Sequence, residues 1–256
     1  MVFKKANPGC PCCPNTGGGF CACYPFNSDA DNNLWDGLHL TSTYGNFGTA
    51  GKLGNASKHT GTQHHHHDHH SCFTPAEEGG LRIWFWLYVT TLPSATTAYQ
   101  GVVTKGRFST AGSPPANTFT GEWGIFWRTQ SGSGTDINFV YKSDTVNLGV
   151  LHQVALSAST WYFVHWELNT DAKLSTLHIN NISDSGTLGG TGTAGLVGVM
   201  QPAPGEPMRV GNNEDGEILG ANSGSFLIDN LGFSHNSGSA SDLYNTGTGL
   251  ACNNEG

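Results

Sequence analysis

The sequence predicts an all-β protein, a sandwich or a barrel, and three observations support this. Short segments rich in aromatic and β-branched residues recur along the 256 residues, and Gly, Asn, Asp or Ser bounds each of them. Long apolar patterns with the period of a helix do not appear. The length permits one large β domain or two smaller ones, and the pattern of segments favours one.

Seven segments are expected to be strands, because each combines β-forming residues with polar boundaries. In chain order they are Leu81 to Thr90, Glu122 to Arg128, Ile137 to Lys142, Trp161 to Leu168, Leu174 to Ile179, Pro207 to Val210 and Phe226 to Phe233.

The connections between these segments carry three further expectations. Residues 169–173 have the composition of a hairpin turn, so the two strands that they join are predicted to form a hairpin. Residues 183–198 are mostly Gly, Thr and Ser, which indicates a long surface loop. Ser239 to Tyr244 is the one stretch expected to form a helical turn, because serines precede it as caps.

The first 24 residues differ from the rest of the chain. Five of the seven cysteines lie there among Pro and Gly residues: Cys10, Cys12, Cys13, Cys21 and Cys23. We expect residues 1–24 to form a Cys-rich cap or docking segment and residues 25–256 to form the β domain. Adjacent Cys12 and Cys13 pair with difficulty, so disulfides would cross the Gly-rich turn to Cys21 or Cys23. A structural zinc site and free thiols are the alternatives. Since seven is odd, Cys72 or Cys252 is a candidate for a free, metal-bound or intermolecular thiol.

Charge and hydropathy exclude two classes of partner. Lys and Arg total 11 against 19 Asp and Glu, a net charge of −8, which argues against nucleic acid because phosphate binding needs cations. The longest unbroken apolar run, Ile83 to Val89, is far shorter than the roughly 20 residues that span a bilayer, so no membrane insertion is expected. No secretory signal peptide is visible after Met1.

Nine motifs follow one another along most of the chain. They are Tyr24-Pro-Phe-Asn-Ser-Asp, Gly51-Lys-Leu-Gly-Asn-Ala56, Leu81 to Leu87, Leu92-Pro-Ser94, Thr160 to Val164, Leu174 to Asn181, Met208 to Asn212, Phe226 to Phe233 and Leu243 to Gly247. In this order they resemble a laminin-G-like, concanavalin A-like domain. The resemblance implies a two-sheet antiparallel jelly-roll sandwich, which the Cys-rich N-terminal extension would precede. Legume lectins, pentraxins, laminin G modules and some glucanases share this fold, so it implies little about chemistry.

Hydrolysis is the first chemistry to consider for this fold. Its glucanases place carboxylates as Glu-x-Asp-x-x-Glu on one strand, and that spacing is missing from this sequence. The nearest cluster, Glu214, Asp215 and Glu217, has the composition of a solvated turn. Neither a Gly-x-Ser-x-Gly elbow nor a phosphate-binding loop is present. We therefore expect no catalytic residues and no enzyme activity.

Residues 64–70, HHHHDHH, hold six of the 12 histidines. In an extended strand, His64, His66, Asp68 and His70 would share one face. Imidazoles spaced in this way can bind a transition metal, within one chain or across a symmetry axis. A hydrated polar loop or a purification insert is the alternative interpretation.

Calcium is the last candidate cofactor, because many laminin-G-like and pentraxin domains hold it through loop carboxylates. The matching ligands here are Asp29, Asp31, Asp36 and Asp229. The first three are also typical turn residues. Most of the seven tryptophans lie in predicted strands, where a core role is favoured over sugar stacking.

Three classes of function remain: a structural or adhesive module, a carbohydrate-binding lectin and a hydrolase. We favour the first, a non-catalytic module on a bacteriophage-type virion, either a decoration or a fibre protein. Its location would then be a virion or extracellular surface. Its partners would be further copies of itself or other virion proteins, with glycans as the ligands in the lectin alternative.

Overall fold

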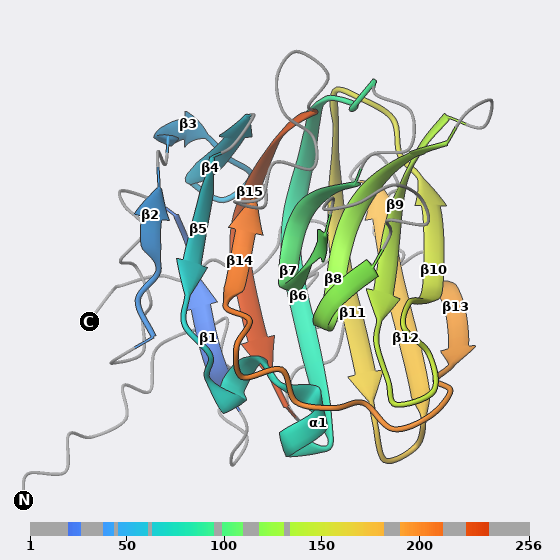
Figure 1. The fold of residues 1–256 in the computed structure, drawn as a ribbon. Helices are drawn as coiled ribbons and strands as arrows, with labels where there is room; N and C mark the ends of the chain where they lie inside the picture. The colour runs from blue at the N-terminus through green and yellow to red at the C-terminus, as the bar shows by residue number, and fades with distance from the viewer. Residues whose placement is uncertain are drawn as a thin grey trace, which may run out of the picture.

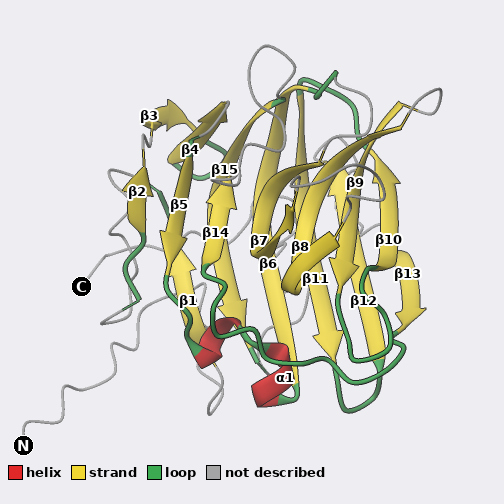
Figure 2. Ribbon diagram, in the orientation of Figure 1, coloured by secondary structure: helices red, strands yellow, loops and turns green. Residues whose placement is uncertain are grey.

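The computed structural model describes residues 20–26, 38–43, 46–60, 63–94, 99–109, 118–130, 134–181, 190–211 and 224–235. The strands among them form two antiparallel sheets that stack face to face (Figures 1 and 2). The predicted all-β, two-sheet antiparallel sandwich is therefore confirmed. Residues 1–19 lie outside the described residues, and residues 20–24 belong to one of the sheets.

The first sheet, called sheet A, follows the order β13-β12-β11-β6-β15-β4-β3, with β1 also paired to β15. On the side of β15 away from β6, β4 pairs with residues 225–228 and β1 with residues 231–234. The register of β15 with β6 shifts between these two halves, from Asp229 to Gly232. The strands are β1 Phe20–Tyr24, β3 Asn46–Ala50, β4 Asn55–Thr60, β6 Gly80–Thr91, β11 Thr160–Asn169, β12 Leu174–Asn181, β13 Gly190–Gly195 and β15 Ser225–Ser234.

The second sheet, called sheet B, follows the order β10-β9-β8-β7-β14-β5-β2. Its strands are β2 Thr41–Thr43, β5 His64–His67, β7 Tyr99–Ser109, β8 Thr118–Gln130, β9 Gly134–Tyr141, β10 Gly149–Ala155 and β14 Met208–Gly211. The 3-10 turn η1 (Ser71–Phe73) and the one-turn helix α1 (Pro75–Glu78) lie between β5 and β6.

The core lies between the sheets and follows the period-two alternation of each strand. In β6, Ile83, Phe85 and Leu87 point into the core, whereas Trp84 and Trp86 point the other way and form a second buried cluster. The predicted hairpin is β11–β12, which pairs without a register shift. Alternating large side chains thus fix which face of sheet A packs against sheet B.

One sequence prediction about local structure is wrong, and one short helix was not predicted. Within the stretch expected to be a loop, residues 190–195 form β13, because an edge strand of Gly and Thr needs only main-chain pairing. Ser239 to Tyr244 lies outside the described residues, and α1 is a helical turn that was not expected. Pro75 at its first turn and Gly79 after its end, at φ 78°, are the helix signals that a four-residue helix retains. Neither short helix of the described part is long and apolar enough to cross a membrane.

Candidate functional site

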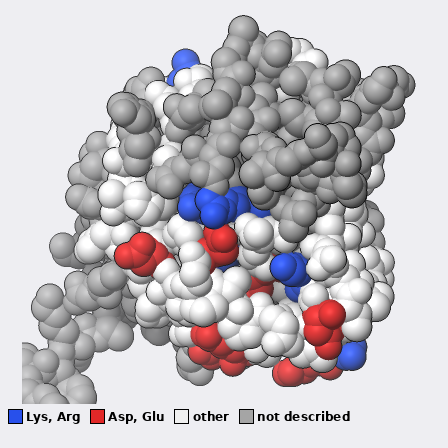
Figure 3. Space-filling model, viewed as in Figure 1, with Lys and Arg blue, Asp and Glu red and all other residues white. Residues whose placement is uncertain are grey.

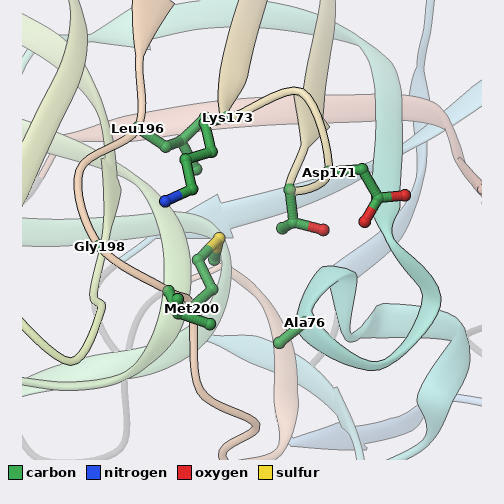
Figure 4. A pocket seen from close by; sticks show the side chains of 8 residues that line it. Ala76, Asp171, Lys173, Leu196, Gly198 and Met200 are labelled. Carbon is green, nitrogen blue, oxygen red and sulfur yellow. The ribbon is translucent and has the colours of Figure 1, made fainter.

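A pocket of about 160 Å³ lies at the end of the sandwich where the β11–β12 turn meets α1 (Figures 1 and 4). Three segments line it: α1, the turn after β11 and the segment 196–207 that follows β13. We call this last segment the strap. The lining residues are Ala76, Thr170, Asp171, Lys173, Leu196, Gly198, Val199 and Met200.

The β11–β12 turn forms the polar wall of the pocket. Thr170 fixes the turn on α1, because its N–H donates to Gly79 O at 3.0 Å and its hydroxyl donates to Pro75 O at 3.3 Å. Figure 4 shows the Lys173 amine extending toward the strap and the Asp171 carboxylate pointing away from it. Lys173 has a φ of 51°, an unusual conformation for a lysine, and its carbonyl accepts from Leu196 N at 2.9 Å.

The strap forms the apolar wall, and its first half is fixed to the end of β9. Val197 N donates to the Tyr141 hydroxyl at 2.7 Å, and Val199 N donates to Asp144 Oδ1 at 2.8 Å. Gly198 has a φ of 79°, and a Cβ there would lie 2.2 Å from Thr145 Oγ1. Only glycine fits between these two anchors, so the wall is held in one conformation.

The second half of the strap is fixed by Lys105, a fully buried residue of β7. Its ammonium donates to Ala203 O at 2.9 Å and to Glu206 O at 3.0 Å, and it lies 3.0 Å from His69 Nδ1. Burial lowers the pKa of Lys105, and the nearby Glu122 carboxylate opposes this effect. Lys105 thereby links the strap to sheet B.

Glu122 links α1 to the strap. It is the extra residue of a β-bulge, because Gly121 pairs with Gly106 while Trp123 pairs with Lys105. Its Oε1 accepts from Ala76 N at 3.0 Å, and the Ala203 main chain is a second donor to the carboxylate. Its Oε2 has no hydrogen-bond partner in the described part of the chain. Burial raises the pKa of Glu122 to about 7.

The acidic side chains of this region have structural partners. Glu206 lies 3.7 Å from both Arg107 Nε and Arg209 Nη1. Figure 3 shows basic side chains near the middle of its view with acidic ones beside and below them. Glu214, Asp215 and Glu217, the nearest cluster in the sequence to a catalytic pair, lie outside the described residues. Sequence reasoning missed Lys105 and Glu122, since an isolated charge in a strand pattern gives no signal of its role.

The histidine run begins as a strand but does not continue as one. β5 ends at His67, so Asp68 and His70 lie beyond the alternation that was expected to align them with His64 and His66. The rings of His64 and His66 do lie together, 5.7 Å apart between centroids. His70 instead accepts a hydrogen bond from Cys72 N at the start of η1. In the parts of the chain that are described, no three His, Cys, Asp or Glu side chains are grouped to hold a metal ion.

The other face of β5 uses a histidine to connect the two sheets. His65 Nε2 lies 2.6 Å from Ser57 Oγ of β4, and its ring stacks on Phe26 and Phe47. The ring of His59 stands edge-on to it, with 5.2 Å between centroids. Burial is the main cause that lowers the pKa of His65 to about 2 and that of His59 to about 4. Both imidazoles are therefore neutral near neutral pH, and the fully buried Ser57–His65 contact has a structural role.

Asp229, the one predicted calcium ligand within the described residues, holds a turn. Its Oδ2 accepts from Leu53 N at 2.7 Å, and a Cβ on Gly51 would lie 2.6 Å from the same oxygen. Beside it, Lys52 Nζ lies 5.1 Å from the centre of the Trp86 ring. Burial raises the pKa of Asp229 to about 6. Asp29, Asp31 and Asp36 lie outside the described residues.

The cysteine predictions fall mostly on residues that are not described. Cys10, Cys12, Cys13 and Cys252 lie outside the described residues, as does the side chain of Cys21. Cys23 is buried in β1 and is disulfide-bonded. Cys72 is buried in η1, against the core. The pairing scheme of the N-terminal segment stays a prediction.

Comparison with known proteins gives a fold likeness. No family model matches the sequence, and no curated protein matches it. The fold is similar to the receptor-binding domain of botulinum neurotoxin C/D mosaic serotype, with a TM-score of 0.59 and 12% identity over 88% of this chain and 49% of that chain.

Two further neurotoxin structures have the same likeness. The serotype D ligand-binding domain in complex with N-acetylneuraminic acid has a TM-score of 0.53 and 12% identity, over 82% of this chain and 46% of that one. A type C structure comes from a toxin whose cell entry depends on interaction with two ganglioside molecules. It has a TM-score of 0.57 and 10% identity, over 88% of this chain and 49% of that one. This chain spans about half the length of these chains, and the likeness shows a lectin-like β-sandwich fold alone.

Proposed function

We propose that this protein is a non-catalytic adhesive module that binds a saccharide in the pocket at the end of the sandwich. The lining of the pocket is the observation that carries the proposal. Leu196, Val199 and Met200 form an apolar wall, and Thr170 and Lys173 supply a hydroxyl and an ammonium on the other side. A sugar ring presents C–H groups on its faces and hydroxyls on its rim, so it complements such a mixed lining.

The size and rigidity of the pocket support one sugar unit as its occupant. Its volume of about 160 Å³ is below the roughly 300 to 1,000 Å³ of pockets that enclose drug-sized ligands. One ring therefore fills it, and the rest of a glycan extends into solvent. Because the strap is fixed at both halves, binding requires little ordering of the protein.

The fold neighbours support the same ligand class. They are receptor-binding domains, one of them in complex with N-acetylneuraminic acid. At 12% identity they do not carry residues over to this chain, so the pocket itself defines the site to test.

The test is a broad glycan array, followed by titration of the best ligand. Lys173→Gln removes the pocket ammonium, and Lys58→Gln on β4 is a control with the same change in charge. We expect Lys173→Gln to weaken binding about tenfold, the value of one charge-assisted hydrogen bond, and Lys58→Gln to leave it unchanged. Silence on the array, equal binding by both variants, or glucan cleavage by the wild-type protein would contradict the proposal.

Metal dependence is a separate part of the proposal. Asp229 Oδ1 is buried and has no hydrogen-bond partner among the described residues, so it fits a calcium ligand. The histidine run is the place for a transition metal, through His64 and His66. Elemental analysis of the purified protein tests both, and loss of glycan binding in EDTA would tie calcium to the function.

We further propose that the module is displayed on a virion surface and attached by its Cys-rich N-terminal segment. The support is the sequence, which combines few charges with many Gly, Ser, Thr and Asn residues. A density map of the native particle tests this. Ordered copies of the chain on the capsid or fibre would support it, and a capsid without them would refute it.

A further inference from the structure

Two edge strands on one side of the sandwich are long enough to pair with another chain. Sheet B ends there in β10, with seven residues, and sheet A ends in β13, with six. The two strands are neighbours at this side (Figure 1). At the opposite side, β2 has three residues and β3 is interrupted by a register shift. Short or irregular edges are how sheets avoid pairing with other chains. β10 and β13 each have one register shift as well, but they are the longest edge strands in the described part of the chain.

The β10 edge is exposed and uncharged. Its sequence, GVLHQVA, contains no Asp, Glu, Lys or Arg, and Val150, Gln153 and Ala155 are exposed. Beyond a register shift at Val150, residues 152–155 pair regularly with β9. No strand within the described ranges pairs with the free side of β10. Its outer main-chain groups therefore form a regular template for an added strand.

The exposed apolar side chains gather on the same side. Among the described residues, the large hydrophobic side chains that are exposed are Val150, Leu174, Val197 and Val199, at 40 to 58%. Tyr141 connects them, since its ring lies against Gly149 of β10 and its hydroxyl binds Val197. Leu174 pairs with Gly195 at the end of β13. Exposed apolar side chains that gather in one place are typical of a protein–protein interface, and here they lie beside an edge strand.

We propose that a second copy of this chain docks on the β10–β13 side, with β10 antiparallel to its own counterpart across a two-fold axis. An antiparallel strand is self-complementary about such an axis, so one surface serves both partners. The net charge of −8 on each chain favours this patch, because β10 itself has no charged residue and the neighbouring Asp136 carboxylate is buried and hydrogen-bonded to Gln153. Sheet B would then continue through the dimer.

The test measures the mass of the full chain in solution by light scattering and sedimentation velocity, with and without reductant. Gln153→Lys places an ammonium on the exposed β10 edge, where two copies would oppose each other. It also removes the amide that donates to Asp136 Oδ2 of β9, so Val150→Lys, which leaves this hydrogen bond intact, is measured beside it. Thr41→Lys on β2 is the control, since it makes the same change in charge on the opposite edge. Both positions lie away from the pocket. We expect a wild-type dimer, an unchanged dimer for Thr41→Lys and at least tenfold weaker dimerisation for Gln153→Lys.

Three results would overturn the inference. They are a wild-type chain that stays monomeric at every concentration, equal dimerisation by the two variants, and an assembly that dissociates only on reduction. Circular dichroism and thermal unfolding of both variants establish that they are folded. Val150→Lys is the second variant, because it places a charge in the apolar cluster at the start of the same strand and is expected to act in the same direction.

Discussion

Replacing Glu122 with Gln should change how stability depends on pH. Burial raises the pKa of this carboxyl from 4.5 to about 7, so the folded state binds its proton more tightly than the unfolded state does. The contribution to stability is complete below pH 4.5 and is lost as the pH rises through 7. At about 1.4 kcal/mol per pH unit, the loss amounts to about 3 kcal/mol for this fully buried group.

Glu122→Gln removes this titration while keeping the oxygen that accepts from Ala76 N. We therefore expect the free energy of unfolding of the variant, relative to wild type, to rise by about 3 kcal/mol between pH 4.5 and 7. Urea unfolding followed by tryptophan fluorescence at several pH values measures it. Glu78→Gln, an exposed position on α1, controls for the loss of one negative charge.

A difference between Glu122→Gln and wild type that stays constant over this pH range would refute the reasoning. It would mean that Glu122 is hydrated in the folded protein and does not join α1 to the strap. The paired strands β7 and β8 would then have to position α1 and the strap by packing alone.

Two further predictions concern stability. His59→Phe keeps the stacking on Phe226 but removes an imidazole whose pKa falls from 6.5 to about 4, so wild-type stability from this group is lost as the pH falls from 6.5 through 4. Between pH 6.5 and 4 the free energy of unfolding of His59→Phe, relative to wild type, should rise by about 3 kcal/mol in the same urea assay. A difference between the two proteins that stays constant over this pH range would contradict the prediction. Gly198→Ala should cost about 1–3 kcal/mol, because φ is positive and Thr145 occupies the Cβ position. The melting temperature and the glycan affinity of Gly198→Ala should both be lower than those of wild type. An unchanged melting temperature would contradict the description of the strap.

The parts of the fold that the sequence predicts are those marked by alternating large side chains. β6, β11, β12 and β15 were expected at nearly their observed bounds, since each has a buried apolar face. β13 was missed because a sequence of Gly, Thr and Ala has no alternation of large apolar residues, and β7 was missed because glycines and charges interrupt its pattern. Residues that act through main-chain pairing leave little periodicity in a sequence.

The candidate site was predictable only in its turn. Residues 169–173 were expected to form a tight turn, which places Lys173 at an exposed tip. The strap could not be foreseen, because Asp144 and Val199 are 55 positions apart and neither has a local signal for the contact. The histidine run was expected to alternate, and it does so only as far as His67, where the strand ends.

A loop at a binding site usually both sets the shape of the site and contacts the ligand. The anchoring of the strap assigns these two tasks to different residues. Lys105 and Tyr141 belong to strands, so the path of residues 196–207 is set by the rigid body of the molecule. An exposed side chain such as Val199 can then be exchanged without disturbing that path. Related chains with the same two anchors would be free to diverge in what they recognise while remaining superimposable in shape.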